Sequence, residues 1–393
     1  MTLTNETLAN EALANEQTFA GRAVSAEGPE LEEGRIGRGR AHGKAILLGE
    51  HAVVYGAPAL AIPVPQLTVT ATARRLRCSG EDARYSSEDA RCSGEGADRI
   101  SFALAGPGPG EVTPLAADGL RCLLPDFKAI TGAGGHVCVE VIIDCAIPQG
   151  RGLGSSAACA RAAVLALADL IGRRLDAREV FDLVQASENV AHGRSSGIDA
   201  LATGATAPLL FRSGAARELP VPMPGYAPAH SASHESEGIG RDPGEGLPYV
   251  FDGLFVLADS GVSGSTKEAV ELLWRKFERS AQTQADFVLG ASRLTRAAAR
   301  DLAYGRTRDF GARMTENHKL LHELGLSTDR IDGLVDAALA AGSLGAKISG
   351  GGLGGCVIAL AAEPRQAEAT VRSLHEAGAV RTWVVPMGRF ATS

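Results

Sequence analysis

The chain has 393 residues and a formal net charge of −7, with 45% hydrophobic and 22% charged residues. This balance is typical of a globular protein, and the length suggests two domains or one large one. The sequence has no concentrated basic stripe, so we expect no nucleic-acid partner, and any phosphate must be bound by local features.

Neither the start of the chain nor its apolar stretches predict a membrane segment. The polar, acidic N-terminus lacks the charged-then-apolar order of a signal peptide. The apolar stretch Ala157–Ile171 is interrupted by Arg161 and Asp169 and is too short to span a bilayer. The seven cysteines show neither CxxC pairs nor metal-ligand spacing. We therefore expect a cytoplasmic protein with reduced thiols and no membrane partner.

Composition divides the chain into four segments. Residues 1–34 are acidic and aperiodic and predict a flexible tail. Residues 35–213 are expected to form an N-terminal domain, with residues 78–98 as an insertion. Residues 214–248 are rich in Gly, Pro, Ser and His and predict a flexible linker or insertion. Residues 249–393 are expected to form a C-terminal domain.

Hydrophobic periodicity predicts the main elements in chain order. Strands are expected at 43–49, 67–76, 136–147, within 249–260, at 344–349 and at 356–361, and helices at 155–171, 177–190, 265–279, 281–304, 306–323 and 330–341. Strand runs followed by helix runs predict an α+β fold and not a doubly wound sheet.

The segment Pro148–Ala158, PQGRGLGSSAA, is a glycine loop that opens an alanine-rich helix. Its glycines let the backbone approach a ligand, and the helix N-terminus presents free N–H groups to an anion. Ser155 and Ser156 supply hydroxyls that can bind Mg²⁺. The alternative is an N-capped helix after a flexible turn. The segment is not the common P-loop, because GxxxxGK[ST] is absent.

Charged residues interrupt two other segments. Lys44, Glu50 and His51 lie in the apolar segment Gly43–Val64, which is predicted to include a strand. Charged groups are rarely buried in such a segment without a partner. Glu188 and Asp199 lie in Ser187–Asp199, and two carboxylates near a phosphate loop suggest one for Mg²⁺ and one for a substrate hydroxyl. Each residue also has a structural alternative. Lys44 could extend from a strand end and His51 could be a structural histidine, whereas Glu188 could be a solvated helix residue and Asp199 a helix cap.

Two segments of the second half complete the set. Lys347–Cys356, KISGGGLGGC, predicts a glycine loop pressed against a ligand or another backbone, or a flexible hairpin connection. It matches GxGxxG at Gly350, Gly352 and Gly355, but no helical pattern follows, so we reject a dinucleotide site. Asp259–Ala269, DSGVSGSTKEA, predicts either a helix cap or a hydroxyl near the reacting groups.

In this order the motifs resemble the superfamily of galactokinase, homoserine kinase, mevalonate kinase and phosphomevalonate kinase. GKAILLGEHAVVYGAPALAIPV, ENVAHGRSSGID and SGVSGSTKEAV are most similar to the mevalonate kinase family. The resemblance implies a two-domain small-molecule kinase fold, with the active site in the cleft between an N-terminal ribosomal-protein-S5-domain-2-like half and a C-terminal ferredoxin-like half. Ser349 departs from the threonine usual in the late loop but keeps its hydroxyl.

The resemblance also implies residue roles. Asp199 matches the residue that accepts or orients the substrate hydroxyl, and Lys44 matches the lysine beside it. Ser156 and Glu188 match Mg²⁺ ligands. The positions matching the ATP-phosphate loop are Pro148, Gly150, Arg151, Gly152, Leu153, Gly154, Ser155, Ser156 and Ala157, where the Arg151 side chain either adds charge near ATP or faces solvent. The positions near the acceptor substrate are Glu50, His51, Thr266, Gly350 and Gly351.

The activity implied is transfer of the γ-phosphoryl group of ATP, with Mg²⁺, to the primary hydroxyl of mevalonate. The resemblance also implies a possible homodimer. Alternatives are a related kinase acting on phosphomevalonate, homoserine or a sugar, and a nucleotide-binding sensor without turnover. Retention of Lys44, Glu188 and Asp199 argues against the sensor.

Overall fold

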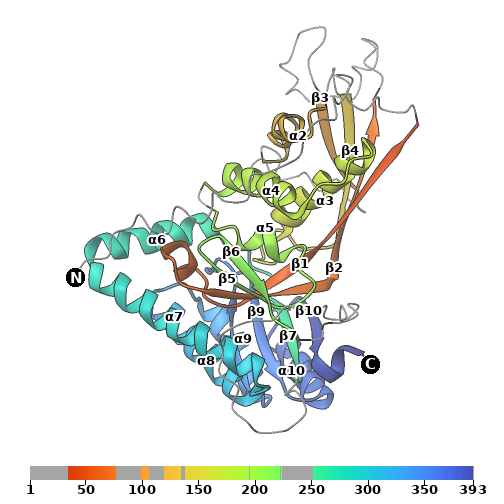
Figure 1. The fold of residues 1–393 in the computed structure, drawn as a ribbon. Helices are drawn as coiled ribbons and strands as arrows, with labels where there is room; N and C mark the ends of the chain where they lie inside the picture. The colour runs from red at the N-terminus through yellow and green to blue at the C-terminus, as the bar shows by residue number, and fades with distance from the viewer. Residues whose placement is uncertain are drawn as a thin grey trace, which may run out of the picture.

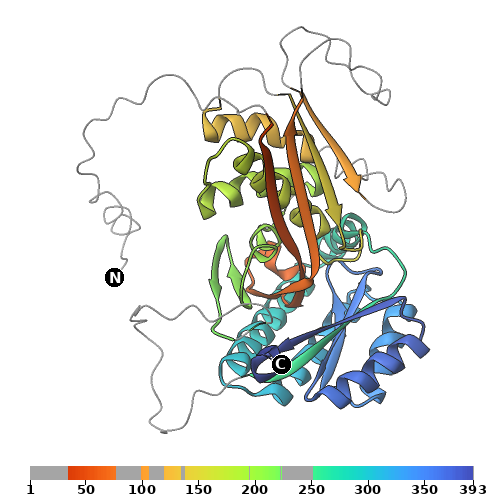
Figure 2. The ribbon, with the colours of Figure 1, turned by 90° about the vertical axis from the view of Figure 1, so that its right-hand side faces the viewer.

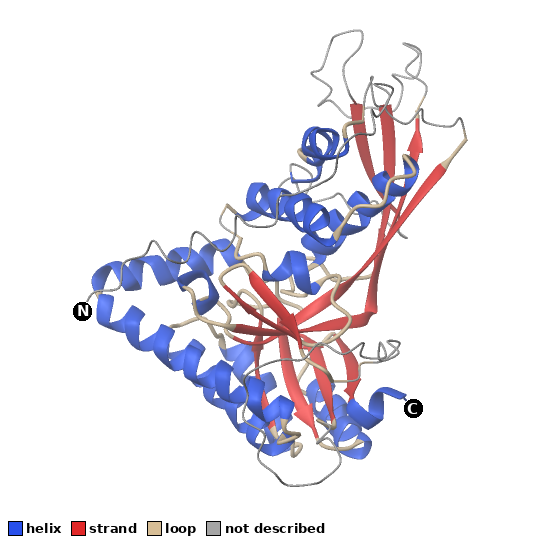
Figure 3. Ribbon diagram, viewed as in Figure 1, coloured by secondary structure: helices blue, strands red, loops and turns tan. Residues whose placement is uncertain are grey.

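The computed structural model describes residues 34–76, 99–105, 119–133, 138–193, 195–221, 223 and 251–392. These residues form two sheets, each packed against helices (Figures 1 and 2). In the upper half of Figure 3 the helices lie to one side of the strands. The predicted tail and the 78–98 insertion lie outside the described residues, apart from Gly34, and the predicted domain limits stay predictions.

The first sheet is mixed and has six strands, with the order β3-β4-β2-β5-β6 and β1 paired to β2. Its strands are β1 (Ile36–Leu48), β2 (Ala59–Arg75), β3 (Arg99–Ala105), β4 (Cys138–Cys145), β5 (Leu209–Arg212) and β6 (Ala215–Glu218). Only β3 and β4 pair in parallel. The first six residues of β2 are all buried and the later ones alternate, as expected for a strand that is covered on both faces at one end only. The register of β1 shifts between His42 and Gly43, just before Lys44.

The helices of the first half lie on one side of this sheet (Figure 1). They are α2 (Leu123–Thr131), α3 (Ser155–Leu170), α4 (Ala177–His192) and α5 (Ile198–Ala202), with the short 3-10 helix η1 (Ala52–Tyr55) after β1. Small residues let α3 lie directly on β1. A Cβ on Gly37 would come 2.0 Å from the carbonyl oxygen of Ala166, and one on Gly39 would come 2.0 Å from that of Ala162. This close packing holds the middle and the end of α3 against β1.

The second half holds a four-stranded sheet, antiparallel throughout, in the order β10-β7-β9-β8. Its elements are β7 (Gly253–Asp259), α6 (Thr266–Arg279), α7 (Ala281–Ala303), α8 (Thr307–Glu323), α9 (Asp329–Ala340), β8 (Gly345–Ser349), β9 (Cys356–Ala361), α10 (Pro364–Glu376), β10 (Arg381–Met387) and η3 (Gly388–Thr392). Ser265, Ser280 and Thr328 cap α6, α7 and α9 through their side-chain oxygens.

The α+β prediction is confirmed, and each predicted helix and strand is present with shifts at its ends. Seven further elements were not predicted from the sequence: β3, α2, β5, β6, α5, α10 and β10. Residues 215–218, inside the predicted linker, form β6. Among the described residues, no helix has both the length and the apolar character needed to cross a bilayer.

The cysteines depart in one place from the expected reduced thiols. Cys122, Cys145, Cys159 and Cys356 are free. Cys138, at the start of β4, is disulfide-bonded. The expectation of reduced thiols therefore fails for this residue.

Candidate active site

The predicted phosphate loop joins β4 to α3. Gly150, Gly152 and Gly154 have φ values of 66°, 74° and 76°, a conformation that favours glycine. Gly154 is the N-cap of α3, and no side chain caps the helix. The first N–H groups of this sixteen-residue helix are therefore free to bind an anion, and the positive end of the helix dipole adds to the attraction.

Lys44 connects this loop to a carboxylate. Its Nζ lies 3.1 Å from Oδ1 of Asp199 and donates to the carbonyl oxygen of Gly152 at 3.0 Å. Its backbone N–H donates to the carbonyl oxygen of Leu153, also at 3.0 Å. The lysine side chain is 3% exposed and that of Asp199 is 28% exposed. The structure thus brings Lys44, Asp199 and the loop together, and the carboxylate stays accessible to a ligand.

Glu188, on α4, lies beside the same group. The hydroxyl of Ser156 donates to its Oε1 at 2.6 Å. Burial, with the negative charge of Asp199, raises the pKa of Glu188 to about 7, although the Ser156 hydrogen bond and Lys44 act in the opposite direction. A buried carboxylate that is hard to ionise in the absence of a cation is a natural place for one.

The oxygen atoms of Ser156, Glu188 and Asp199 fit a hard divalent cation. The described part of the chain holds no cluster of three or more His, Cys, Asp or Glu side chains that could bind a metal alone. Mg²⁺ does not require such a cluster, because it commonly uses one or two carboxylates and completes its shell with water and phosphate oxygens.

The second glycine loop, residues 350–355, packs directly on the phosphate loop. Gly350 has a φ of 92°, and a Cβ placed on it would lie 2.7 Å from the Cα of Gly152. A Cβ on Gly152 would lie 2.9 Å from the Cα of Gly350. The two backbones therefore meet without room for a methyl group, which explains why both segments are rich in glycine.

Gly350→Ala should lower the free energy of unfolding by about 2–4 kcal/mol, because it combines a left-handed conformation with a backbone clash. Urea unfolding measures the loss. The matched control is Gly333→Ala in α9, where a Cβ meets no atom within 4 Å. That variant should gain about 0.5–1 kcal/mol. Equal effects of the two substitutions would contradict the close packing of the loops.

The residues predicted near the acceptor are divided between two environments. His51 has a φ of 58°, and its Nε2 donates to the carbonyl oxygen of Gly351 at 2.9 Å. Burial lowers the pKa of His51 to about 4, so the imidazole is neutral near pH 7. Thr266 begins α6, and its hydroxyl lies 2.4 Å from where a Cβ of Gly351 would be. His51, Thr266 and Gly351 therefore meet at one point.

Glu50 faces the protein interior instead. Its carboxylate forms an ion pair with Lys347, and both side chains are almost fully buried. Asn317 donates to the other carboxylate oxygen at 3.3 Å. The Glu50 carboxylate thus already has partners, and it joins the end of β1 to β8 across the two halves.

The side chain of Arg151 does not face solvent, which was one of its two expected positions, because it is only 18% exposed. Its Nε lies 2.9 Å from Oδ1 of Asp259, at the end of β7. The backbone of Arg151 still belongs to the phosphate loop.

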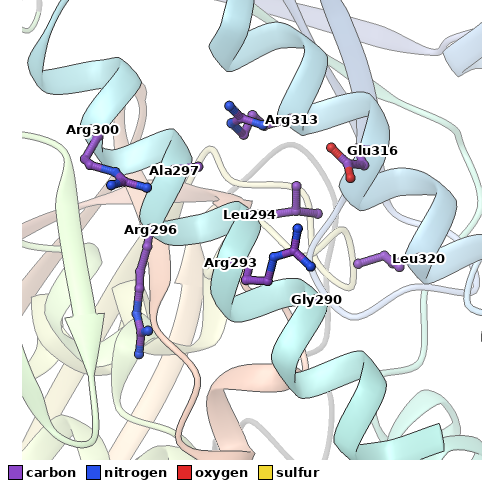
Figure 4. Close-up of a pocket in the computed structure, with 9 residues that line it drawn as sticks. All are labelled: Gly290, Arg293, Leu294, Arg296, Ala297, Arg300, Arg313, Glu316 and Leu320. Carbon is purple, nitrogen blue, oxygen red and sulfur yellow. The ribbon is translucent and has the colours of Figure 1, made fainter.

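A cavity of about 580 Å³ lies elsewhere, between α7 and α8 (Figure 4). The side chains that line it include Arg293, Arg296, Arg300 and Arg313. It contains none of the predicted site residues. The candidate active site is therefore defined by the two glycine loops and their charged neighbours, and not by this cavity.

The chain matches two protein-family models. "GHMP kinases N terminal domain" matches residues 120–205, and "GHMP kinases C terminal" matches residues 296–380. The first span holds the phosphate loop, Glu188 and Asp199. Mevalonate kinase from Thermococcus sibiricus is 32% identical over 336 residues, which cover 84% of this chain and 90% of the relative. The chain belongs to the mevalonate kinase family.

A second relative agrees with this membership of the mevalonate kinase family, and a solved structure agrees with the fold. Mevalonate kinase from Pyrococcus abyssi is 30% identical over 337 residues, covering 84% of this chain and 90% of the relative. The crystal structure of L. major mevalonate kinase in complex with R-mevalonate shares the fold, with a TM-score of 0.65 and 21% identity over 90% of this chain and 96% of that one. The chain therefore has the two-domain GHMP kinase fold, as the resemblance implied.

Three residues at the site of this mevalonate kinase family member were not predicted from the sequence. Lys347, Asn317 and Asp259 received no role, yet they hold Glu50 and Arg151. A usable signal existed for Lys347, a lysine in an otherwise apolar strand, because a buried charge requires a partner. Nothing comparable distinguished Asn317 within the polar text of α8.

Proposed function

We propose that this chain transfers the γ-phosphoryl group of ATP to the primary hydroxyl of mevalonate, giving 5-phosphomevalonate and ADP in the mevalonate route to isoprenoids. The observation that carries the proposal is the cluster of Lys44, Glu188 and Asp199 beside a helix N-terminus, in a chain of the mevalonate kinase family. An anion site, a cation site and an accessible carboxylate together suit phosphoryl transfer.

In this proposal Asp199 accepts the proton of the attacking hydroxyl, or orients that hydroxyl. Lys44 balances the charge of Asp199 and, through Gly152, keeps the carboxylate in register with the phosphate loop. The loop and the start of α3 hold the phosphates through backbone N–H groups. Since phosphoryl transfer requires little covalent work from the protein, positioning and charge stabilisation provide most of the rate enhancement.

We further propose that Ser156 and Glu188 hold Mg²⁺. The short hydrogen bond between them places a hydroxyl and a carboxylate oxygen together at the start of α3. When bound, Mg²⁺ would neutralise charge on the phosphate oxygens. This role also explains why the protein keeps a carboxylate in a place where burial opposes its ionisation.

For the acceptor we propose direct contacts from His51, Thr266 and the backbone of Gly350 and Gly351. A neutral imidazole can bind a hydroxyl without adding a charge to the site. Glu50 then acts indirectly, through Lys347, by holding the turn that carries His51.

The decisive experiment is ADP release measured with a panel of acceptors. Mevalonate should give a far higher kcat/KM than phosphomevalonate, homoserine or galactose. A preference for one of the other acceptors would assign the chain to a related kinase activity. ATP binding without ADP release on any acceptor would support the sensor alternative instead.

Glu188→Gln should change how stability depends on pH in the metal-free protein. A carboxyl group whose pKa is raised by folding binds more protons in the folded chain. Its contribution to stability is full below pH 4.5, the ordinary pKa, and is lost as the pH rises through about 7. Glutamine avoids this loss, so the variant should be more stable than wild type at pH 8, by about 3 kcal/mol, and similar to it near pH 4.5.

Thermal unfolding with a chelator, at both pH values, measures this difference. Glu271→Gln, at an exposed glutamate of α6, is the control and should follow wild type throughout. The activity of Glu188→Gln should also require about tenfold more Mg²⁺. An unchanged Mg²⁺ dependence would remove Glu188 from the cation site.

A further inference from the structure

Arg151 links the phosphate loop to the C-terminal half of the protein. Its side chain is 18% exposed and that of its partner Asp259 is 4% exposed, with Nε 2.9 Å from Oδ1. Nη2 of Arg151 donates to the carbonyl oxygen of Gly261 at 3.0 Å, and the N–H of Gly261 donates to the same Asp259 oxygen at 2.9 Å. The guanidinium therefore holds both the end of β7 and the turn that follows it.

Backbone contacts join the same two regions. The N–H of Gly264 donates to the carbonyl oxygen of Gly150 at 3.0 Å, and the hydroxyl of Ser263 donates to it at 3.3 Å. On its other side, the turn after β7 accepts a hydrogen bond at the carbonyl oxygen of Val262 from the N–H of Gly355, at 2.8 Å. This turn thus lies between the two glycine loops and bonds to both.

Among the described residues, no other ion pair links the phosphate loop to the end of β7. Within the described ranges, two ion pairs cross between the halves, Arg151–Asp259 and Glu50–Lys347. The second joins Glu50, next to His51, to β8 and includes no residue of the phosphate loop. Removing one member of a buried pair leaves the other charge without compensation, so the loop and the turn would separate or rearrange.

We propose that Arg151 is a positioning residue, whose ion pair with Asp259 holds the phosphate loop in the conformation that receives the nucleotide phosphates. The inference rests on the proposed function, which makes this loop the ATP site. A loop released from the turn must be ordered again when the nucleotide binds, and that cost lowers affinity. Asp199 is not part of the link, so the rate of transfer from bound ATP should change much less.

The test compares Arg151→Met, Asp259→Asn and the double variant with wild type. Each should raise the KM for ATP and the Kd for Mg·ADP by about tenfold, with kcat lowered less than about threefold and the KM for mevalonate unchanged. Because both residues act through one link, the double variant should be no worse than either single one. If Arg151→Met fails to fold because Asp259 is left unpaired, the double variant still tests the proposal, because it removes both charges.

The matched control is Arg313→Met, which breaks an arginine–aspartate pair of 3.1 Å to the buried Asp301, within the C-terminal half. It should lower Tm and leave the KM for ATP at the wild-type value. A wild-type KM for ATP in folded Arg151→Met or in the double variant would overturn the proposal. So would a double variant whose effects add, because Arg151 and Asp259 would then act independently and not through their ion pair. Calorimetric titration with Mg·ADP measures nucleotide affinity even if the wild-type protein phosphorylates no acceptor. A failure of the proposed role of Arg151 can therefore be distinguished from a failure of the proposed function.

Discussion

Asp199→Ala should lower kcat by on the order of 10²-fold or more, with a smaller change in the KM for ATP. This result is expected because Asp199 is the more accessible carboxylate of the cluster, with a side chain that is 28% exposed, whereas Glu188 is buried against Ser156. Only an accessible carboxylate can meet the acceptor hydroxyl, and general base catalysis commonly contributes about 10²–10⁴-fold. Steady-state ADP release at saturating ATP and mevalonate measures the loss.

Asp199→Asn is the sharper variant, because it keeps the shape and removes the charge. Wild-type kcat in this variant would exclude Asp199 as the base. The control is Asp182→Ala, which removes an aspartate with a 43% exposed side chain that pairs with Arg178 along α4. Surface pairs of this kind contribute little to stability, so its kcat should equal that of wild type.

The sequence predicted the segments of the site well, because their chemistry is local. A glycine loop before an alanine-rich helix, such as PQGRGLGSSAA, encodes its own conformation through positive φ values and a free helix N-terminus. Periodicity similarly located α3 and α6–α9 to within a few residues. These features depend on neighbours in sequence, and no tertiary contact is required to predict them.

The partners of the charged residues could not be predicted in the same way. Glu50 and Lys347 are separated by 297 positions, and only the packing of β8 against the end of β1 brings them together. From the sequence alone, the position of Glu50 next to His51, in a motif predicted to lie near the substrate, favours a ligand-binding role. The ion-pair partner of Arg151 could not be predicted for the same reason, since Asp259 reaches it from the other half.

The missed elements have a related cause. The apolar residues of α10, Ala367, Val371 and Leu374, follow a helical spacing, but polar residues surround them and the signal is weak. The strand β10 pairs with one neighbour only, β7, and most of its residues are partly exposed. Elements at the edge of a fold carry less apolar pattern, because fewer of their side chains are buried.

Lys44→Met should lower kcat by on the order of 10²–10³-fold and also destabilise the protein by roughly 2 kcal/mol. The lysine is the cation shared by the Asp199 carboxylate and the Gly152 carbonyl, so its loss affects both the base and the loop. It also leaves the carboxylates of Asp199 and Glu188 close together without a balancing charge. Asp199→Ala should not cause this repulsion between two carboxylates, because it removes one of the two negative charges.

Comparison of Lys44→Met, Asp199→Asn and the double variant separates the two effects of the lysine. If Lys44 and Asp199 act as a unit, the double variant should have about the kcat of the worse single variant. The double variant should also recover part of the Tm lost in Lys44→Met, since asparagine leaves no unpaired charge beside Glu188. Lys319→Met, at an exposed lysine of α8, should leave both kcat and Tm unchanged. Additive losses in kcat would instead mean that Lys44 acts on the transferring phosphoryl group independently of Asp199, and its ion pair with the base would then be structural.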